Sequence, residues 1–136
     1  MRYALREHTA DVGVEAWGDS RGEVFAALGD GMAAAMCDDV PPGGERFPVE
    51  VDAESTEAAL FDYLDELIYQ RDVRDVLPVD NRATVELSGD RWRVRASARG
   101  VPLSDVDARE IKAVTYSEMV VEEIEDGWHG FVVLDV

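Results

Sequence analysis

Two aspartates that border apolar runs are the residues best placed to bind a cation. Asp11 comes directly before an alternating apolar run, and Asp135 ends the run Phe131–Leu134 and is followed by Val136. Hard cations such as Ca²⁺ take oxygen ligands from carboxylates and backbone carbonyls. Asp11, Asp135 and the carboxylate of Val136 are therefore a candidate calcium site.

Each of these carboxylates also has a purely structural interpretation. Asp11 follows His-Thr-Ala, a polar stretch typical of a turn, and an aspartate that caps an Asx-type turn is the commoner role there. Asp135 and Val136 are also compatible with an exposed tail that binds nothing. From the residues alone, both interpretations stay open.

Two basic side chains are candidates for contact with a phosphate or an acidic partner. His8 has the near-neutral pKa of a proton carrier, although a histidine that stabilises a turn is commoner. Lys112 is the single lysine among 13 basic residues, and the neighbouring Glu110 equally allows an ordinary surface ion pair. Ser117 has no adjacent base in the sequence that would activate it as a nucleophile.

The usual catalytic signatures are missing from the sequence. It has no phosphate-binding loop with Lys-Ser or Lys-Thr, no GxGxxG, no nucleophile elbow and no His-Glu-x-x-His. One cysteine and two histidines do not make the usual structural zinc site. A conventional phosphate-loop or zinc enzyme is therefore not expected.

The chain is strongly acidic, with 30 Asp and Glu against 13 Lys and Arg and a net charge of −17. Such a body repels phosphates, so we expect no direct binding of nucleic acid. The acidic residues are spread along the whole chain, a pattern that keeps a protein hydrated in concentrated salt and predicts a halophilic source. The single Cys37 cannot form an internal disulfide, and neither a leader segment nor a membrane-spanning run is evident, so we expect a cytoplasmic protein.

The periodicity predicts one domain, residues 1–136, in which 46% hydrophobic residues supply a single core. A capping box at Ser20 begins a helix that runs to about Met36, and Ser55 or Thr56 begins a second one. Alternating runs predict strands over 3–6, 12–17, 47–51, 83–87, 92–98, 111–116, 119–124 and 128–135. Because βαβα alternation is absent, we expect an α+β two-layer domain, with a mixed, mostly antiparallel sheet and two main helices on one face.

Four segments of the sequence resemble the archease family. They are His8-Thr-Ala-Asp-Val-Gly-Val14, Leu60-Phe-Asp-Tyr-Leu-Asp-Glu-Leu-Ile-Tyr69, Ile111-Lys-Ala-Val-Thr-Tyr116, and Gly127-Trp128 ahead of Val132-Val-Leu-Asp-Val136. The match spans nearly the whole chain. Four motifs in the right order and spacing are much more specific than any one of them.

The resemblance implies a non-catalytic cytosolic cofactor of RtcB, the GTP-dependent RNA ligase that seals tRNA exons. Archease-like proteins promote formation of the ligase's guanylylated histidine and permit multiple turnover. The family's metal positions match Asp11 and Asp135, with Val136 as third ligand and calcium as the associated ion. Lys112 would then lie at the partner-facing surface.

One residue departs from the family pattern, and two other functions stay open. Many relatives have a histidine after the tyrosine of the third motif, where this chain has Ser117, so a role for that histidine is unsupported here. A chaperone or modulator of a tRNA-modifying enzyme, such as a tRNA methyltransferase, would be favoured by a broad exposed apolar patch. A free-standing metal-dependent hydrolase would need a general base and an open metal position.

Overall fold

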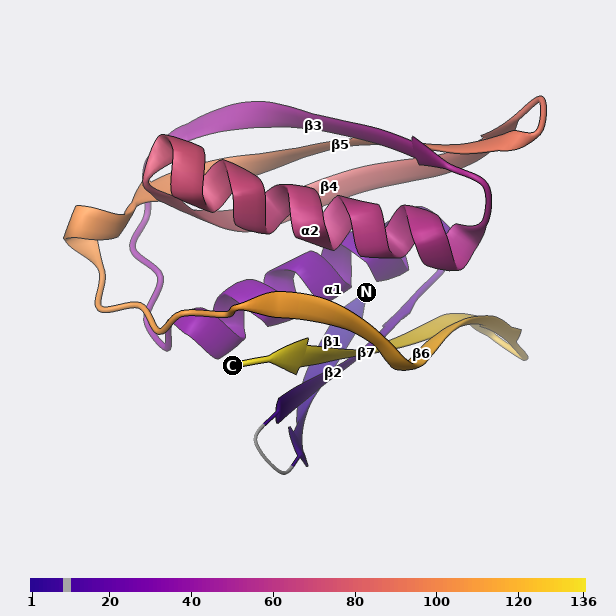
Figure 1. Ribbon diagram of the computed structural model, residues 1–136, viewed down its shortest axis with the longest axis horizontal. Coiled ribbons are helices and arrows are strands. Elements are labelled where there is room, and N and C mark those ends of the chain that lie inside the picture. The colour runs from indigo at the N-terminus through magenta and orange to yellow at the C-terminus, as the bar shows by residue number, and fades with distance from the viewer. Residues whose placement is uncertain (9–10) are drawn as a thin grey trace.

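Two helices lie between two antiparallel sheets (Figure 1). The structure, a computed structural model, describes residues 1–8 and 11–136, with the side chains of residues 6–8 outside the description. The elements are β1 (Arg2–His8), β2 (Asp11–Gly18), α1 (Arg21–Met36), β3 (Glu45–Ala53), α2 (Thr56–Arg74), β4 (Val76–Ser88), β5 (Arg91–Pro102), a 3₁₀ turn (Leu103–Asp105), β6 (Ala113–Ile124) and β7 (Gly127–Asp135).

The α+β class and the two main helices are confirmed. The strands differ from the prediction in how they are divided between sheets and in their bounds, and β6 covers the two strands predicted over 111–116 and 119–124. They form a four-stranded sheet of order β1-β2-β7-β6 and a three-stranded sheet of order β3-β5-β4, and every strand pair described is antiparallel. The prediction of a single mixed sheet with both helices on one face is therefore corrected. Periodicity reports which side of a strand is buried but not which strand is its neighbour.

Helix α1 is buried on several sides because it packs between the sheets. Ser20 caps its first turn by accepting a hydrogen bond from the Glu23 N–H at 3.2 Å, as the capping box predicts. Close packing is possible because small residues face the sheets: a Cβ on Gly22 would overlap the backbone of β4 at Ala83, and one on Gly31 would overlap Val14 of β2. The glycines of this helix therefore set how closely it approaches both sheets.

Helix α2 has the predicted cap and one continuous buried stripe. The Ser55 side chain accepts from the Ala58 N–H at 3.1 Å, and the buried stripe consists of Leu60, Tyr63, Leu64, Leu67 and Ile68. Strand β4 then begins at Val76, earlier than the predicted residue 83. Pro78 and a register shift between Val79 and Arg82 interrupt the alternation there, which is why the sequence did not indicate a strand.

A polar network joins both helices to β4 at this irregularity. Asn81 is buried, and its backbone N–H and side-chain Nδ2 donate to Asp30 Oδ1 at 2.8 and 2.9 Å, while the Tyr63 hydroxyl donates to Asn81 Oδ1 at 3.0 Å. Burial, with a smaller contribution from the charge of Asp80, raises the pKa of Asp30, although the Asn81 hydrogen bonds and Arg46 act in the opposite direction. The ionised carboxylate is therefore a cost to folding that its hydrogen bonds only partly offset.

We expect the free energy of unfolding of Asp30→Asn to increase relative to that of wild type as the pH rises. Because the pKa of Asp30 is raised in the folded protein, this carboxyl group stabilises the fold at pH values below 3.8, its ordinary pKa. That stabilisation is lost as the pH rises through the raised pKa. Asparagine keeps an acceptor oxygen for Asn81 but cannot ionise. Urea unfolding of both proteins from pH 4 to 8 measures the difference, with the exposed Asp65→Asn as charge control. A difference between Asp30→Asn and wild type that does not change with pH would contradict the assignment.

None of the helices in the described part of the chain combines the length and apolarity needed to cross a membrane.

Candidate carboxylate site

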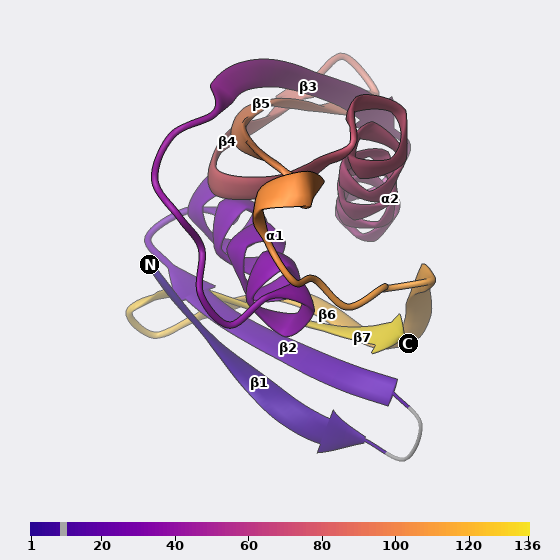
Figure 2. The ribbon, with the colours of Figure 1, turned by 90° about the vertical axis from the view of Figure 1, so that its left-hand side faces the viewer.

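The register of the four-stranded sheet places Asp11 directly opposite Asp135. Asp11 is the first residue of β2, and its Cα partner in β7 is Asp135, the last residue of that strand. Figure 2 shows the end of β7 beside the start of β2. Directly opposed side chains on antiparallel neighbours share a face, with Cβ atoms about 4.5–5.5 Å apart. The two aspartates predicted from distant parts of the sequence are therefore brought together.

This carboxylate pair points away from the hydrophobic core. The next pair along the strands is Val12 with Leu134, and Leu134 is completely buried. Because side chains alternate across a sheet, Asp11 and Asp135 lie on the opposite, outer face. Asp135 is exposed and Asp11 is partly exposed, so the pair is accessible from solvent.

The chemistry of the donor set is that of a hard-cation site. Carboxylate oxygens are ligands that Ca²⁺ takes, and a bound divalent cation would offset the repulsion between two like charges on neighbouring strands. Val136, which follows Asp135 at once, is the predicted third ligand. Among the described residues no cluster of three or more His, Cys, Asp or Glu side chains has metal-binding geometry. The pair would therefore need oxygens beyond its own side chains.

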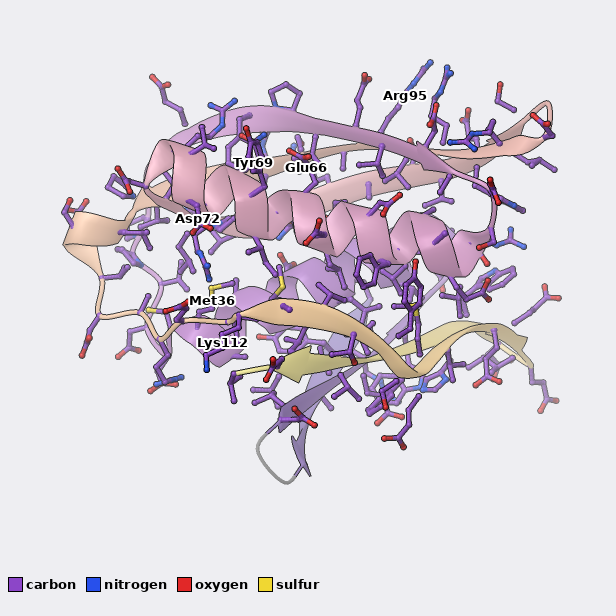
Figure 3. All side chains as sticks on the ribbon, in the orientation of Figure 1. Met36, Glu66, Tyr69, Asp72, Arg95 and Lys112 are labelled. Carbon is purple, nitrogen blue, oxygen red and sulfur yellow. The ribbon has the colours of Figure 1, made fainter. Side chains whose placement is uncertain are left out.

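Lys112 is tied to this pair through the backbone. Its N–H donates to the Asp135 carbonyl at 2.8 Å, and the next residue, Ala113, is the Cα partner of Asp135 in β6. Figure 3 shows Lys112 beside the end of β7. The alternative ion pair with Glu110 is not formed within the described residues. A single exposed ammonium therefore lies at the same edge as two carboxylates.

The segment that leads to Lys112 is held by contacts from both helices. The buried Arg71 of α2 donates from a guanidinium nitrogen to the Ile111 carbonyl at 3.2 Å. Arg109 donates its backbone N–H to the Met36 carbonyl at 2.6 Å and its Nε to the Ala35 carbonyl at 3.2 Å, at the end of α1. These bonds satisfy carbonyls that the helix leaves unpaired. The position of Lys112 is therefore fixed by residues that lie outside the carboxylate pair.

We expect Arg71→Met to destabilise the protein by about 1–3 kcal/mol, because the Ile111 carbonyl loses its donor in a buried environment. Arg74→Met is the matched control, since Arg74 lies in the same helix and is exposed. Its guanidinium stacks on Phe47 at 4.6 Å, a contact of about 0.5–1 kcal/mol at an exposed site. Urea unfolding compares the two variants. Equal losses would show that Arg71 does not hold the segment.

The predicted role of His8 is not tested by the described structure, and Ser117, for which the sequence indicated no catalytic role, lies outside the site. His8 is the Cα partner of Asp11 in β1, but its side chain lies outside the described residues, so its role stays a prediction. The predicted turn residues Thr9 and Ala10 also lie outside the description. Ser117 is exposed and donates its N–H to the Thr115 hydroxyl at 3.3 Å, a backbone role that gives no chemistry to its own hydroxyl.

Sequence reasoning missed two side-chain arrangements. The rings of Tyr116 and Phe61 stack at 4.4 Å and join β6 to α2, and burial, with a smaller effect of Asp62, raises the pKa of Tyr116. His129 bridges Glu15 and Glu122 at 2.9 and 2.7 Å. Strand alternation puts His129 on the same face as Asp135, but six residues away along β7, so it is not part of the carboxylate site.

Comparisons with known proteins identify the family of this chain. The model of the archease protein family matches residues 3–136. The protein archease of Thermococcus gammatolerans is 35% identical, with 99% of each chain covered. An archease-like protein of Drosophila melanogaster is 28% identical over all of this chain and 91% of its own length.

Solved structures show the same fold. The solution structure of protein 1598 of Methanobacterium thermoautotrophicum has a TM-score of 0.86 at 26% identity, with 98% of each chain covered. The crystal structure of an archease of Thermotoga maritima, described as a possible chaperone, has a TM-score of 0.62 at 25% identity, covering 100% of this chain and 98% of its own.

Proposed function

This chain belongs to the archease family, and we propose that it is a non-catalytic cofactor that activates the GTP-dependent RNA ligase RtcB in tRNA splicing and RNA repair. It would promote guanylylation of the ligase and permit multiple turnover. The observation that supports this most is the pair Asp11 and Asp135, opposed across β2 and β7, with Lys112 bonded to the same edge.

In the proposed mechanism, Asp11 and Asp135 would hold a divalent cation together with Val136, and Ca²⁺ is the ion expected. When bound, the cation supplies positive charge that attracts phosphate oxygens. The carboxylates fix its position because both belong to strands of one sheet. Lys112 orients a phosphate or an acidic group of the partner, because it is exposed and its backbone is anchored to Asp135.

The partner in this proposal is a protein, and the proposed location is the cytoplasm. A net charge of −17 favours docking on a basic protein surface, because complementary potentials raise the rate of encounter. No direct contact with nucleic acid is needed for this role.

The experiment for this proposal is the guanylylation of RtcB from the same organism. Labelled GTP and ligase are mixed with and without the protein, and covalently bound guanylate is measured over time. We expect wild type to raise the rate, and Lys112→Gln to raise it less while still binding calcium. Arg82→Gln, which removes one exposed positive charge from the three-stranded sheet, is the control. An unchanged rate with wild type would contradict the proposal.

A chaperone or modulator of a tRNA-modifying enzyme, such as a methyltransferase, is the second candidate. Exposed apolar side chains favour it: Tyr69 and Val73 lie one turn apart on α2 with 57% and 60% exposure. The Thermotoga relative is also described as a possible chaperone. Suppression of client aggregation by wild type, lost in Tyr69→Ser and kept in Asp11→Asn, would favour this function over ligase activation.

A further inference from the structure

Six of the 13 basic residues lie on one face of the three-stranded sheet. The strand register places them on the outer side, opposite the core-facing Val49, Val94 and Ala98. Figure 3 shows Arg95 pointing off this sheet, away from the helices. We call this surface the arginine face; its basic residues are Arg46 of β3, Arg82 of β4 and Arg91, Arg93, Arg95 and Arg99 of β5.

The arginine face differs in charge from the rest of the protein. Its six arginines are accompanied by the carboxylates of Glu50, Asp52, Asp80 and Glu86, and those of Glu54 and Asp90 lie near Arg91 at one end of the face. The rest of the chain has seven basic residues against 24 acidic ones. The arginine face is therefore close to neutral on a molecule that is otherwise strongly negative.

Three arginines at the centre of the face are not used by the fold. Arg46 pairs with Asp80 at 2.9 Å, and Arg91 pairs with Asp52 at 3.1 Å. In the part of the chain that the structure describes, Arg82, Arg93 and Arg95 form no ion pair, even though Glu50 is the Cα partner of Arg95. Their exposed guanidinium groups are available to a ligand.

Two shallow hollows run along these arginines. One of about 420 Å³ is lined by Glu50, Asp52, Arg93 and Arg95, and the other, of about 320 Å³, by Glu50, Arg82, Thr84, Arg95 and Ser97. Arg95 and Glu50 line both. The hollows thus combine guanidinium and hydroxyl groups, which often contact phosphate oxygens, with the carboxylates of Glu50 and Asp52.

We propose that the arginine face binds the sugar–phosphate backbone of RNA. Pro48 is the only apolar residue among the outward positions of the paired strands, so the face lacks the apolar core of a typical protein interface. It has no outward aromatic ring on which a base would stack. The arginine face therefore fits a ligand that is bound through its phosphates and whose bases are not recognised.

The net charge of the protein does not exclude this binding. Charges farther than about 8 Å from the ligand are largely screened at physiological ionic strength, so the local surface decides. The choice of RNA over other phosphodiester polymers rests on the proposed function, in which the protein acts beside RNA. Glu50 opposes binding from within both hollows, so the affinity is expected to be modest.

The test is the fluorescence anisotropy of a labelled 20-nucleotide poly(U) RNA titrated with the protein alone. The KCl series starts at the lowest concentration that preserves the folded circular dichroism spectrum. We expect wild type to bind with an affinity that falls as KCl rises. The double variant R93Q/R95Q should bind at least about tenfold more weakly, with a salt slope shallower by about 1.4, because each phosphate contact on a single strand contributes about 0.7.

Two further variants make the test specific. Glu50→Gln removes the opposing charge and should bind more tightly than wild type. R2Q/R109Q removes the same charge from other surfaces and should change the affinity less than about threefold. The proposal is overturned by absence of binding in the lowest salt, by equal losses in the two double variants, or by a poly-glutamate peptide that displaces the labelled RNA as well as unlabelled poly(U) does. No ligase is present, so a failed ligase assay and a failed RNA assay are separate results.

Discussion

Asp135→Asn is expected to weaken calcium binding by at least about 100-fold. Loss of a group that only supports a metal ligand typically costs 10–100-fold in affinity, and this substitution removes the charge of a proposed ligand itself. Asp11→Asn should have a similar effect, because the two residues are Cα partners and would share the ion. Isothermal titration with Ca²⁺ measures both.

The control for this prediction is Asp126→Asn. Asp126 is an exposed carboxylate in the turn between β6 and β7, and its loss changes the net charge equally. It should leave calcium binding unchanged. If Asp11→Asn, Asp135→Asn and Asp126→Asn all bind like wild type, the carboxylate pair is not a calcium site.

Gly22→Ala is expected to destabilise the fold by about 2 kcal/mol, which is the upper end of the usual cost of overpacking less the gain in helix propensity. A methyl group at this position would overlap the carbonyl oxygen of Ala83 and crowd the backbone of Thr84. Overpacking typically costs about 1–3 kcal/mol, and a backbone neighbour in a sheet cannot move aside as a side chain can. The gain in helix propensity, about 1 kcal/mol, does not compensate.

Gly29→Ala in the same helix is the matched control. Its added Cβ would lie 3.1 Å from Asn81 Cγ and from the Tyr63 hydroxyl oxygen, both of them side-chain atoms. Because side chains can adjust, we expect a smaller loss than at Gly22. Urea unfolding at one salt concentration compares the two. A Gly22→Ala protein as stable as wild type would show that α1 is not in close contact with β4.

Local patterns in the sequence were enough to predict the helices and most strands. Ser20 and Ser55 cap their helices as predicted. These features depend on neighbours within a few residues. Capping residues and the periodic spacing of apolar residues are therefore enough to locate helices and most strands from the sequence.

Features that depend on long-range neighbours were not predicted. The division of the strands into two sheets depends on which strands pair, and periodicity carries no information on pairing. The guanidinium of Arg21 lies over the rings of Trp92 and Trp128, at 4.7 and 4.1 Å from their centres. Each tryptophan is more than 70 positions from Arg21 in the chain. Such contacts appear only once the tertiary structure is known.

The candidate site was predicted in part for the same reason. Asp11 and Asp135 were singled out because each borders an apolar run, and the register of β2 and β7 then makes them partners. The support that Arg71 and Arg109 give to the segment before Lys112 has no local signal. The arginine face was also missed, because its residues come from three strands and only the sheet places them together.

The most direct test of the central claim is the number of ligation events completed by each RtcB molecule. The assay uses ligase from the same organism, in the salt that keeps both proteins folded, with wild type, Asp11→Asn or Asp135→Asn, each confirmed to be folded. We predict many turnovers with wild type and about one with either variant. Equal turnover with wild type and both variants would contradict the claim that the carboxylate pair activates the ligase.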